Sequence, residues 1–425
     1  MKKTISLICL LLATITALQK VCSQRVLTYE EFIKNVNEKN IEFIVEKYNV
    51  SIAEAYAQAA KIFPDPDFSF SYENNQDRSL QMGQIYAAEL GYTLELGGKR
   101  NARMAVAQSE KQITAALVED FFRNLRADAT LCFLEALKQK RLVDLALSSY
   151  ESMKELARAD SIRFRLGEIS EVNALQSRLE ATTMMTEYIQ VETVFKNMLS
   201  DLAIFEGGVA DLDIRQITSL QGNLQIITRT FNLKNLIDLA QTNRADLQAA
   251  VRNRELSAAN VKLAKANRVI DLGLNIGFAH NTIVLNEIAP APKFNAVSAG
   301  VSIPLKFSNK NKGQLLAAQF SERQAEAQYD AVLLQIRIEV EQRYNSYISA
   351  CRQAELYKNN TLSDATTILE KKKISYSRGE TSLLEVLDAQ RTANEVYQNY
   401  YEALFNANAS LVELNRAVGI WEVEF

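Results

Sequence analysis

Four segments of the chain alternate between apolar and polar or small residues. Two lie close together at about 66–73 and 85–96, and two more lie at about 269–279 and 296–307. A period of two predicts β-strands with one apolar and one polar face. All five prolines lie at the ends of these segments or in a loop between two of them, where a missing backbone N–H is tolerated. The pattern therefore predicts two pairs of strands.

Two much longer stretches contain neither glycine nor proline. They cover residues 99–166 and 314–378. Because Gly and Pro are the usual interrupters of helices, each stretch predicts a helix of roughly 100 Å at a rise of about 1.5 Å per residue. Apolar residues then recur at alternating steps of three and four, which is typical of helices that pack side by side. These residues are Tyr188, Val191, Phe195, Met198 and Leu202, and Tyr397, Tyr400, Leu404, Ala407, Leu411 and Leu414.

The same short turn occurs at the end of both long stretches. It reads Gly-Glu-Ile-Ser at 167–170 and Gly-Glu-Thr-Ser at 379–382, 212 residues later. Such self-similarity predicts a duplicated unit. We expect each half to contain a helix, two strands, a long helix, a tight turn and a further helix. The two repeats are residues 24–215 and 216–425, with hairpin tips at 166–170 and 378–382.

The N-terminus has the pattern of a secretory signal peptide. Lys2 and Lys3 precede the apolar stretch Ile5–Leu18, and small residues follow before a cleavage site near Ser23. Residues 1–23 are therefore expected to be removed. Cys22 offers lipidation as an alternative, although the preceding residues are a poor context for it.

Composition and charge restrict the chemistry. The formal net charge of −3 does not indicate a nucleic-acid partner. After cleavage, Cys132 and Cys351 remain, either as free thiols or as an oxidised pair. His280 is the only histidine, so neither a Ser/His/Asp site nor a multi-histidine metal site is available within one chain. We expect no enzyme, no cofactor and no metal site.

The strand length indicates a location for the sheet. A tilted strand of about ten residues can cross an outer membrane with its apolar face toward lipid. A soluble sheet packed on one side shows the same alternation and is the alternative. The signal peptide and the long helices favour the membrane. Because backbone groups in lipid must be paired, four strands need further copies to close a barrel. Three copies leave room for a pore, whereas two give a filled interior.

The chain resembles the TolC family of outer-membrane efflux proteins, and its CzcC or CusC heavy-metal branch, over essentially its whole mature length. The residues that carry the resemblance are Gly167-Glu168-Ile169-Ser170 with Leu175-Gln176, Gly379-Glu380-Thr381-Ser382 with Val386-Leu387-Asp388-Ala389-Gln390, Ile303-Pro304-Leu305, and Leu96-Gly97-Gly98-Lys99-Arg100. The expected fold is mainly α with a small β part. Long helical hairpins would form a trimeric periplasmic α-barrel, and four strands per chain would contribute to a 12-stranded transmembrane β-barrel.

The resemblance also implies a function and partners. It implies a homotrimer in outer-membrane lipid that passively exports heavy-metal cations or drugs. Its partners would be a periplasmic adaptor and an RND-type pump of the inner membrane, reached directly or through the adaptor. The tunnel of a type I secretion system and a periplasmic coiled-coil scaffold without a pore are the alternatives.

Two acidic residues beyond the second turn are candidates for a gate. Glu385 and Asp388 lie three residues apart and so share one helical face. Three copies would bring six carboxylates to one constriction, which would attract cations. In the TolC family, acidic residues at these positions line the periplasmic gate. Arg165, Arg178 and Arg378 lie near the tips and are expected to hold the closed state through ion pairs. A solvated helix face is the alternative interpretation of the acidic pair.

The turns themselves are candidates for contact with the adaptor, because the tips of TolC-like proteins meet the adaptor's hairpin end-on. The residues concerned are Leu166, Gly167, Glu168, Gly379, Glu380 and Thr381. At the opposite end of the first long helix, Gly97 and Gly98 permit a sharp strand-to-helix corner. Lys99, Arg100 and Arg103 are expected there beside lipid headgroups.

Overall fold

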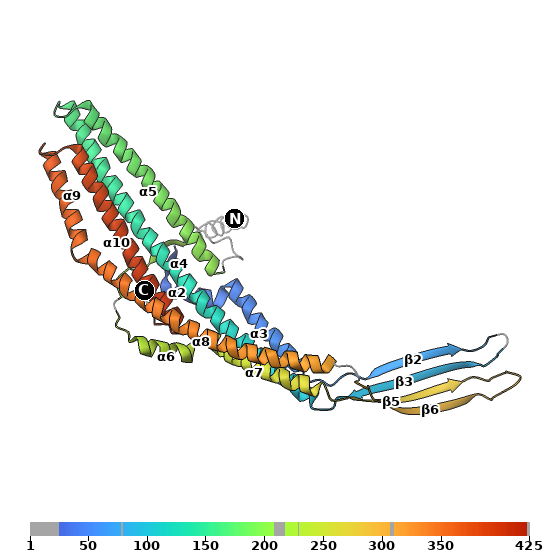
Figure 1. Ribbon diagram of the computed structural model, residues 1–425. Coiled ribbons are helices and arrows are strands. Elements are labelled where there is room, and N and C mark those ends of the chain that lie inside the picture. The colour runs from blue at the N-terminus through green and yellow to red at the C-terminus, as the bar shows by residue number, and fades with distance from the viewer. Residues whose placement is uncertain (1–24, 78–79, 208–216, 228, 307–309, 423–425) are drawn as a thin grey trace, which may run out of the picture. The chain divides into compact units, whose positions relative to one another are not determined.

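The computed structural model describes residues 25–77, 80–207, 217–227, 229–306 and 310–422 (Figure 1). The expected signal peptide and Cys22 lie outside this part of the chain. Two compact units are present. Among the described residues, the first contains those within 25–46, 120–244 and 335–422, and the second contains those within 47–119 and 245–334. In the described part of the chain, no helix is both long enough and apolar enough to cross a membrane.

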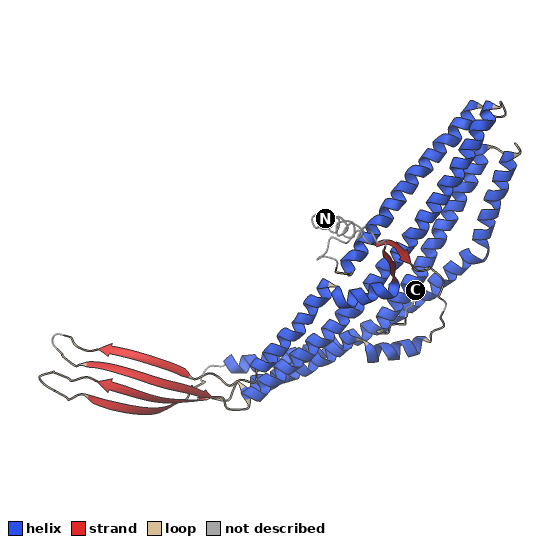
Figure 2. Ribbon diagram, turned by 180° about the vertical axis from the view of Figure 1, so that it is seen from behind, coloured by secondary structure: helices blue, strands red, loops and turns tan. Residues whose placement is uncertain are grey.

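The second unit contains a four-stranded antiparallel sheet (Figure 2). The strands are β2 (Asp67–Asn74), β3 (Gln84–Leu94), β5 (Leu272–Asn281) and β6 (Phe294–Ser302), in the order β2-β3-β5-β6. The pairing of β3 with β5 joins the two sequence repeats. The last strand ends at Ser302, before the expected end near residue 307, because Pro304 has no N–H for the ladder.

One face of the sheet is apolar and exposed. Phe70 lies opposite Ala88, which lies opposite Phe278, and Phe278 lies opposite Val297. Opposed residues project from the same face. Phe70 is 65% exposed and Val297 is 76% exposed, so a single chain leaves this face uncovered. An exposed apolar face of this kind marks a surface that contacts lipid or another protein.

The corner between β3 and helix α4 (Lys99–Arg165) is closed by internal ion pairs. Gly97 has a φ of +72°, and a Cβ there would lie 2.5 Å from Cβ of Val269. Lys99 is buried, and its Nζ lies 2.5 Å from Oδ2 of Asp271, while Arg103 lies 2.7 Å from Glu95. Lys99 and Arg103 were expected beside lipid headgroups. The structure gives both of them carboxylate partners within the protein.

The first unit contains the tips of both helical hairpins, and α4 belongs to this unit from Asp120 onward. The first hairpin consists of α4 and α5 (Glu171–Phe205), and the second of α9 (Leu362–Ser377) and α10 (Leu383–Val418). The repeats begin with the helices α2 (Tyr29–Lys39) and α3 (Ile41–Ala59), and α6 (Leu233–Asn243) and α7 (Ala245–Ala266). Of these, α7 and most of α3 belong to the second unit. A parallel pair, β1 (Arg25–Thr28) and β4 (Ile217–Gln221), joins the starts of the repeats. Large buried side chains of the first unit include Phe32, Phe133, Leu134, Leu202, Ile336, Tyr347 and Leu411.

The two long helices differ. Helix α4 is continuous over 67 residues. In the second repeat, α8 (Lys310–Leu356) is followed by a π-helical turn, Tyr357–Thr361, before α9 begins. Figure 1 shows the change of direction between α8 and α9. The glycine- and proline-free stretch 314–378 is therefore not one regular helix.

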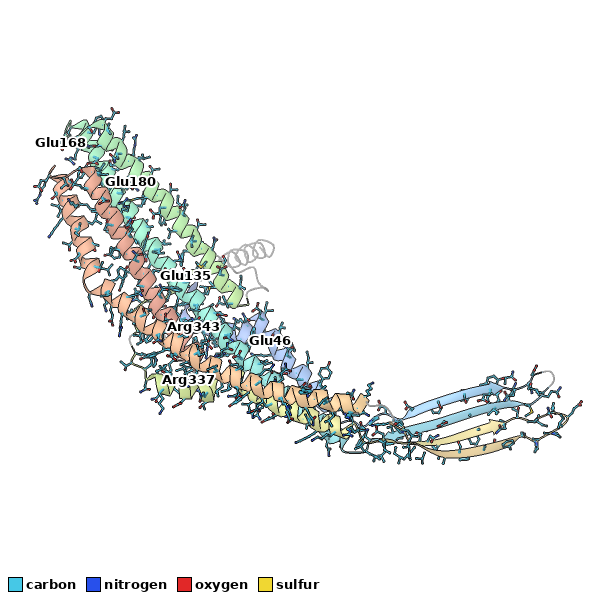
Figure 3. All side chains as sticks on the ribbon, in the orientation of Figure 1. Glu46, Glu135, Glu168, Glu180, Arg337 and Arg343 are labelled. Atoms are coloured by element: carbon cyan, nitrogen blue, oxygen red, sulfur yellow. The ribbon has the colours of Figure 1, made fainter. Side chains whose placement is uncertain are left out.

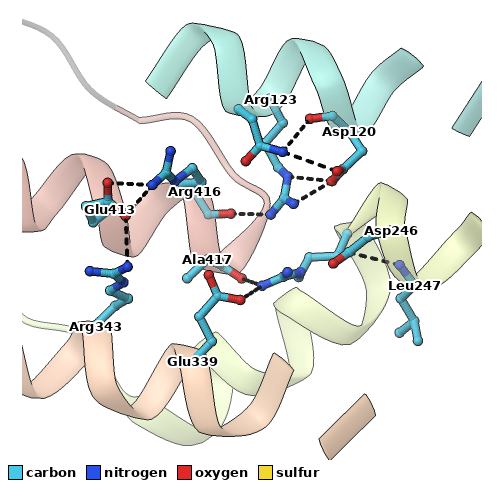
Figure 4. A network of polar contacts seen from close by, with 11 residues as sticks. Asp120, Arg123, Asp246, Leu247, Glu339, Arg343, Glu413, Arg416 and Ala417 are labelled. Carbon is cyan, nitrogen blue, oxygen red and sulfur yellow. Dashed lines mark hydrogen bonds and ion pairs between the residues drawn. The ribbon is translucent and has the colours of Figure 1, made fainter. Parts of the chain in front are cut away.

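Polar contacts fix the end of α10 (Figure 4). Arg123 donates to the carbonyl of Arg416 at 2.6 Å, and the buried Arg244 donates to the carbonyl of Ala417 at 2.9 Å. Arg244 also pairs with Glu339 at 2.7 Å. The last carbonyls of a helix lack the N–H donors of a following turn. Arg244 supplies a donor to the carbonyl of Ala417, and Arg123 adds one to the carbonyl of Arg416, which also accepts from the N–H of Gly419. These arginines complement the negative end of the helix dipole as well.

The two cysteines of the described chain are free thiols. Cys351 is buried and Cys132 is half-buried. Burial raises the pKa of Cys132 to about 11, with a further contribution from Asp201 and Glu135. This arrangement agrees with the free-thiol interpretation and not with an oxidised pair.

Candidate functional site: the hairpin tips

The two tips have the same backbone conformation. Gly167 has a φ of +78° and Gly379 a φ of +76°, and a Cβ at either position would meet no atom within 4 Å. Glycine is therefore required by the left-handed backbone rather than by lack of space. The N–H of Glu168 donates to the carbonyl of Arg163 at 2.9 Å, and that of Glu380 donates to the carbonyl of Ser375 at the same distance. The repeated sequence thus produces a repeated turn.

The residues of these turns form the exposed surface of each tip. Leu166 is 70% exposed, and Gly167, Glu168, Gly379 and Glu380 are exposed as well. Thr381 is half-buried, and its hydroxyl is buried without a hydrogen-bond partner among the described residues. Figure 3 shows Glu168 at the end of the first hairpin and Glu180 farther along α5.

Glu385 has a structural role at the second tip. It is the third residue of α10, and its carboxylate accepts from the N–H of Ser382 at 3.3 Å while Ser382 Oγ accepts from the N–H of Glu385 at 3.4 Å. This reciprocal capping box stabilises the start of α10. Oε2 of Glu385 also lies 2.5 Å from Nζ of Lys372 on α9. The hydrogen bond from Lys372, supported by that from Ser382, lowers the pKa of Glu385.

Asp388 lies one turn farther along α10. Its Oδ1 lies 2.8 Å from Nη2 of Arg391, and both side chains are exposed. Glu385 and Asp388 line the same cavity of about 190 Å³ between α9 and α10, together with Lys372. Asp388 also lines a cavity of about 410 Å³ with residues of α5 and α10, whose acidic members are Glu180, Glu187, Asp388 and Glu395.

Arg178 and Arg378, which were expected to form ion pairs near the tips, do not pair with Glu385 or Asp388 within one chain. Arg178 and Arg378 are both exposed, and within the described part of one chain neither side chain forms an ion pair. Lys372 and Arg391 occupy that role for Glu385 and Asp388. Because Arg391 follows Asp388 by three residues on a helix, the sequence alone could have predicted this ion pair. Lys372 comes from the other arm of the hairpin and gives no local signal.

A buried polar contact that sequence reasoning missed joins the two hairpins. Asp160 of α4 is fully buried, and both of its carboxylate oxygens accept from the Tyr376 hydroxyl of α9 at 3.0 Å. Arg163 lies 3.7 Å from Asp160 and 3.3 Å from Glu168, and its guanidinium lies 5.3 Å from the centre of the Tyr376 ring. Tyr376 stands where the first repeat has Phe164, so comparing the repeats reveals the added hydroxyl.

Apolar packing surrounds this contact. Burial, with a contribution from Asp160, raises the pKa of Tyr376 to about 12. The hydroxyl therefore remains a donor at neutral pH. The buried cluster around Tyr376 draws on all four hairpin helices and contains Met153, Ala157, Ala181, Met184, Leu383 and Val386. The hydrogen bond between Tyr376 and Asp160 thus lies inside an apolar contact between the two hairpins.

Among the residues that the structure describes, no group of three or more His, Cys, Asp or Glu side chains is placed to hold a metal ion. His280 at the end of β5 has Nδ1 2.7 Å from Oδ1 of Asn295.

Comparisons with known proteins agree with this architecture. Residues 236–420 match the family model for outer membrane efflux proteins. The chain is 22% identical over 393 residues to the cobalt-zinc-cadmium resistance protein CzcC of Cupriavidus metallidurans, covering 92% of this chain and 90% of CzcC. It is 20% identical over 409 residues to the outer membrane protein TolC of Vibrio cholerae, covering 90% and 88%.

Solved structures share the fold. CusC superimposes with a TM-score of 0.74 at 15% identity, covering 94% of this chain and 93% of CusC. The outer membrane channel CmeC of Campylobacter jejuni superimposes with a TM-score of 0.72 at 17% identity, covering 92% and 85%. The expected mainly helical fold with a small β part is confirmed. These relatives are channels and efflux proteins, which is consistent with a chain that is not an enzyme. The chain is therefore similar over about nine-tenths of its length to CzcC and TolC, and its second half matches the family model for outer membrane efflux proteins.

Proposed function

We propose that three copies of this chain form the outer-membrane exit duct of a tripartite efflux system. The observation that carries the proposal is the sheet, whose apolar face is exposed and whose outer strands, β2 and β6, each have one partner among the described residues. Exposed edges and unpaired backbone groups are not tolerated in lipid. Further copies must therefore supply the missing pairs.

The strand directions support closure by identical copies. Each neighbouring pair in the order β2-β3-β5-β6 is antiparallel, so β2 and β6 run in opposite directions. β6 of one copy and β2 of the next would consequently pair antiparallel and continue the alternation around a ring. Three copies supply twelve strands, enough for a water-filled lumen.

The tips form the periplasmic end of this duct in the proposal. The exposed turns at Leu166, Gly167 and Glu168 and at Gly379, Glu380 and Thr381 are the adaptor contacts. The adaptor connects the duct to an inner-membrane pump of the RND type. Tyr376 and Asp160 hold the second hairpin against the first, and Lys372 holds Glu385. Opening the tip requires the two hairpins to separate. Ion pairs of Arg178 and Arg378 with neighbouring copies would add to the closed state.

Divalent heavy-metal cations are the proposed cargo. CzcC is named for resistance to cobalt, zinc and cadmium, and the alignment with it covers 92% of this chain. Around a three-fold axis, Glu385 and Asp388 place six carboxylates at the tip. The larger neighbouring cavity adds Glu180, Glu187 and Glu395. Acidic lining raises the local concentration of cations.

Removal of the gene from its host tests the proposal. We expect lower tolerance of Co²⁺, Zn²⁺ and Cd²⁺, restored by the wild-type chain, because export would stop at the outer membrane. Unchanged tolerance of all three metals would contradict the cargo assignment. Loss of a secreted protein instead would favour a type I secretion duct.

A further inference from the structure

The helical arm that leads to the second tip, α8 through α9, holds one residue more than α4 does. Along the helices, buried positions of the two repeats correspond at a separation of 211, namely Leu125 with Ile336, Ala129 with Val340 and Ala136 with Tyr347. The tip glycines, Gly167 and Gly379, are 212 residues apart. The π-helical turn Tyr357–Thr361 lies between these two regions. A π turn spans one residue more than an α turn, so it accommodates the extra residue.

This turn places a lysine on the wall of a cavity. Lys358 lines a cavity of about 340 Å³ in the first unit, together with Arg141 of α4, Asn223 of the loop between β4 and α6, and Tyr400 and Tyr401 of α10. The corresponding stretch of α4 in the first repeat is continuous α-helix. The volume is within the range of small-molecule sites. π turns inside α-helices are frequent at functional sites.

The charges in this cavity are of one sign. Arg141 and Lys358 are its only charged lining residues, and neither forms an ion pair with a carboxylate of the described chain. Nη2 of Arg141 donates to Oδ1 of Asn223 at 2.6 Å, which orients the guanidinium. Asp144, one turn along α4, is exposed and is not part of the wall. Two cations thus face a cavity that contains no anion of the protein.

The other walls define the ligand further. Tyr400 and Tyr401 offer phenol hydroxyls and ring faces, with centroids 5.8 Å apart, and Leu404 adds an apolar side chain. A guanidinium and an ammonium recognise carboxylates and phosphates through charge-assisted hydrogen bonds. We propose that this cavity is a binding site for a small organic oxyanion, a carboxylate or a phosphate on an apolar or aromatic body.

Isothermal titration of the full-length trimer in detergent tests the proposal. The probes are benzoate and phenyl phosphate, which differ in their anionic group, and benzamide, which is the neutral counterpart of benzoate. We expect at least one anion to bind about tenfold or more tightly than benzamide, because only the anions use both cations. The preferred anion then identifies the carboxylate or the phosphate as the recognised group. Failure of both anions to bind, or equal binding of benzamide, would overturn the proposal.

Variants test the residues and the turn. Arg141→Gln and Lys358→Met should each weaken anion binding by about tenfold or more. Lys371→Met, an exposed lysine of α9 outside the cavity, is the charge-matched control and should bind as the wild type does. Deletion of Asn359 should restore a regular helix, retain the circular dichroism of the trimer and abolish binding. Unchanged affinity in Lys358→Met or in the folded deletion variant would overturn the assignment.

Discussion

The hydroxyl of Tyr376 on α9 lies 3.0 Å from both carboxylate oxygens of Asp160 on α4. Asp160 is fully buried, so this contact satisfies a charge that water cannot reach. The nearest guanidinium, that of Arg163, is 3.7 Å away. This hydrogen bond therefore joins the two hairpins. Without the Tyr376 hydroxyl, the buried carboxylate of Asp160 would lose its hydrogen-bond donor from α9.

Tyr376→Phe should loosen the tip. The variant keeps the ring in the apolar cluster but removes the donor to Asp160, which we expect to lower the free energy of unfolding by about 1–3 kcal/mol. Resting current through reconstituted trimers in planar bilayers should rise. Tyr397→Phe is the control, because its hydroxyl meets Thr366 at 2.9 Å within the second hairpin. Equal currents in the two variants would show that the contact with Asp160 does not hold the tip closed.

Removing the acidic pair should change both current and selectivity. Glu385→Ala with Asp388→Ala deletes the partner of Lys372 and up to six carboxylates of the trimer, so resting conductance should rise and cation preference should fall. Reversal potentials under a salt gradient measure the preference. The control is Glu151→Ala with Glu155→Ala, two exposed carboxylates of α4. If conductance and selectivity both remain unchanged in the acidic-pair variant, these residues do not form the gate.

Bulky side chains at the tip glycines should prevent adaptor docking. Gly167→Leu with Gly379→Leu places side chains on left-handed backbone, at a cost on the order of 1 kcal/mol each, and covers the exposed turns. The trimer should persist while cross-linking to the adaptor is lost. Gly313→Leu is the matched control, since that glycine of α8 also has free space around it. Retained cross-linking in the tip variant would place the adaptor contact elsewhere.

Thiol reactivity should follow the raised pKa of Cys132. Because the pKa is raised to about 11, the folded state favours the neutral thiol, and the thiolate needed for alkylation becomes abundant only as pH approaches that value. The stabilisation from the neutral thiol is complete below the unfolded pKa and is lost as pH rises through about 11. Iodoacetamide labelling should be slow at neutral pH.

Both cysteines should react after unfolding in denaturant without reductant. Rapid labelling of the native protein would contradict the buried environment of Cys132. Absence of thiols after unfolding would reveal a disulfide instead.

The strands and the tips were predictable because each rests on a local pattern. Alternation along Phe68, Phe70 and Tyr72 specifies a strand whatever its surroundings, and Gly379 followed by Ser382 specifies a helix end and a new helix start. The π turn at Tyr357–Thr361 was not predicted, because one extra residue in a long helix needs no glycine or proline and so leaves no local sequence signal. It becomes visible only when the two repeats are compared.

Part of the tip depends on contacts between distant residues. Asp160 looks like an ordinary charged residue of a long helix, and its burial follows from the packing of α9 against α4. The same holds for Lys372, whose partner Glu385 lies on the other arm of the hairpin. Spacing placed Glu385 and Asp388 on one face. The spacing could not show that the carboxylate of Glu385 pairs with Lys372 on the other helix.

Electrical recording from planar lipid bilayers tests the exit duct most directly. Detergent-solubilised wild-type trimers should insert and give discrete, cation-selective current steps, because twelve strands from three copies would enclose a water-filled lumen. Tyr376→Phe trimers should give larger steps. Absence of current steps from both proteins, with intact trimers present in the bilayer, would contradict the account.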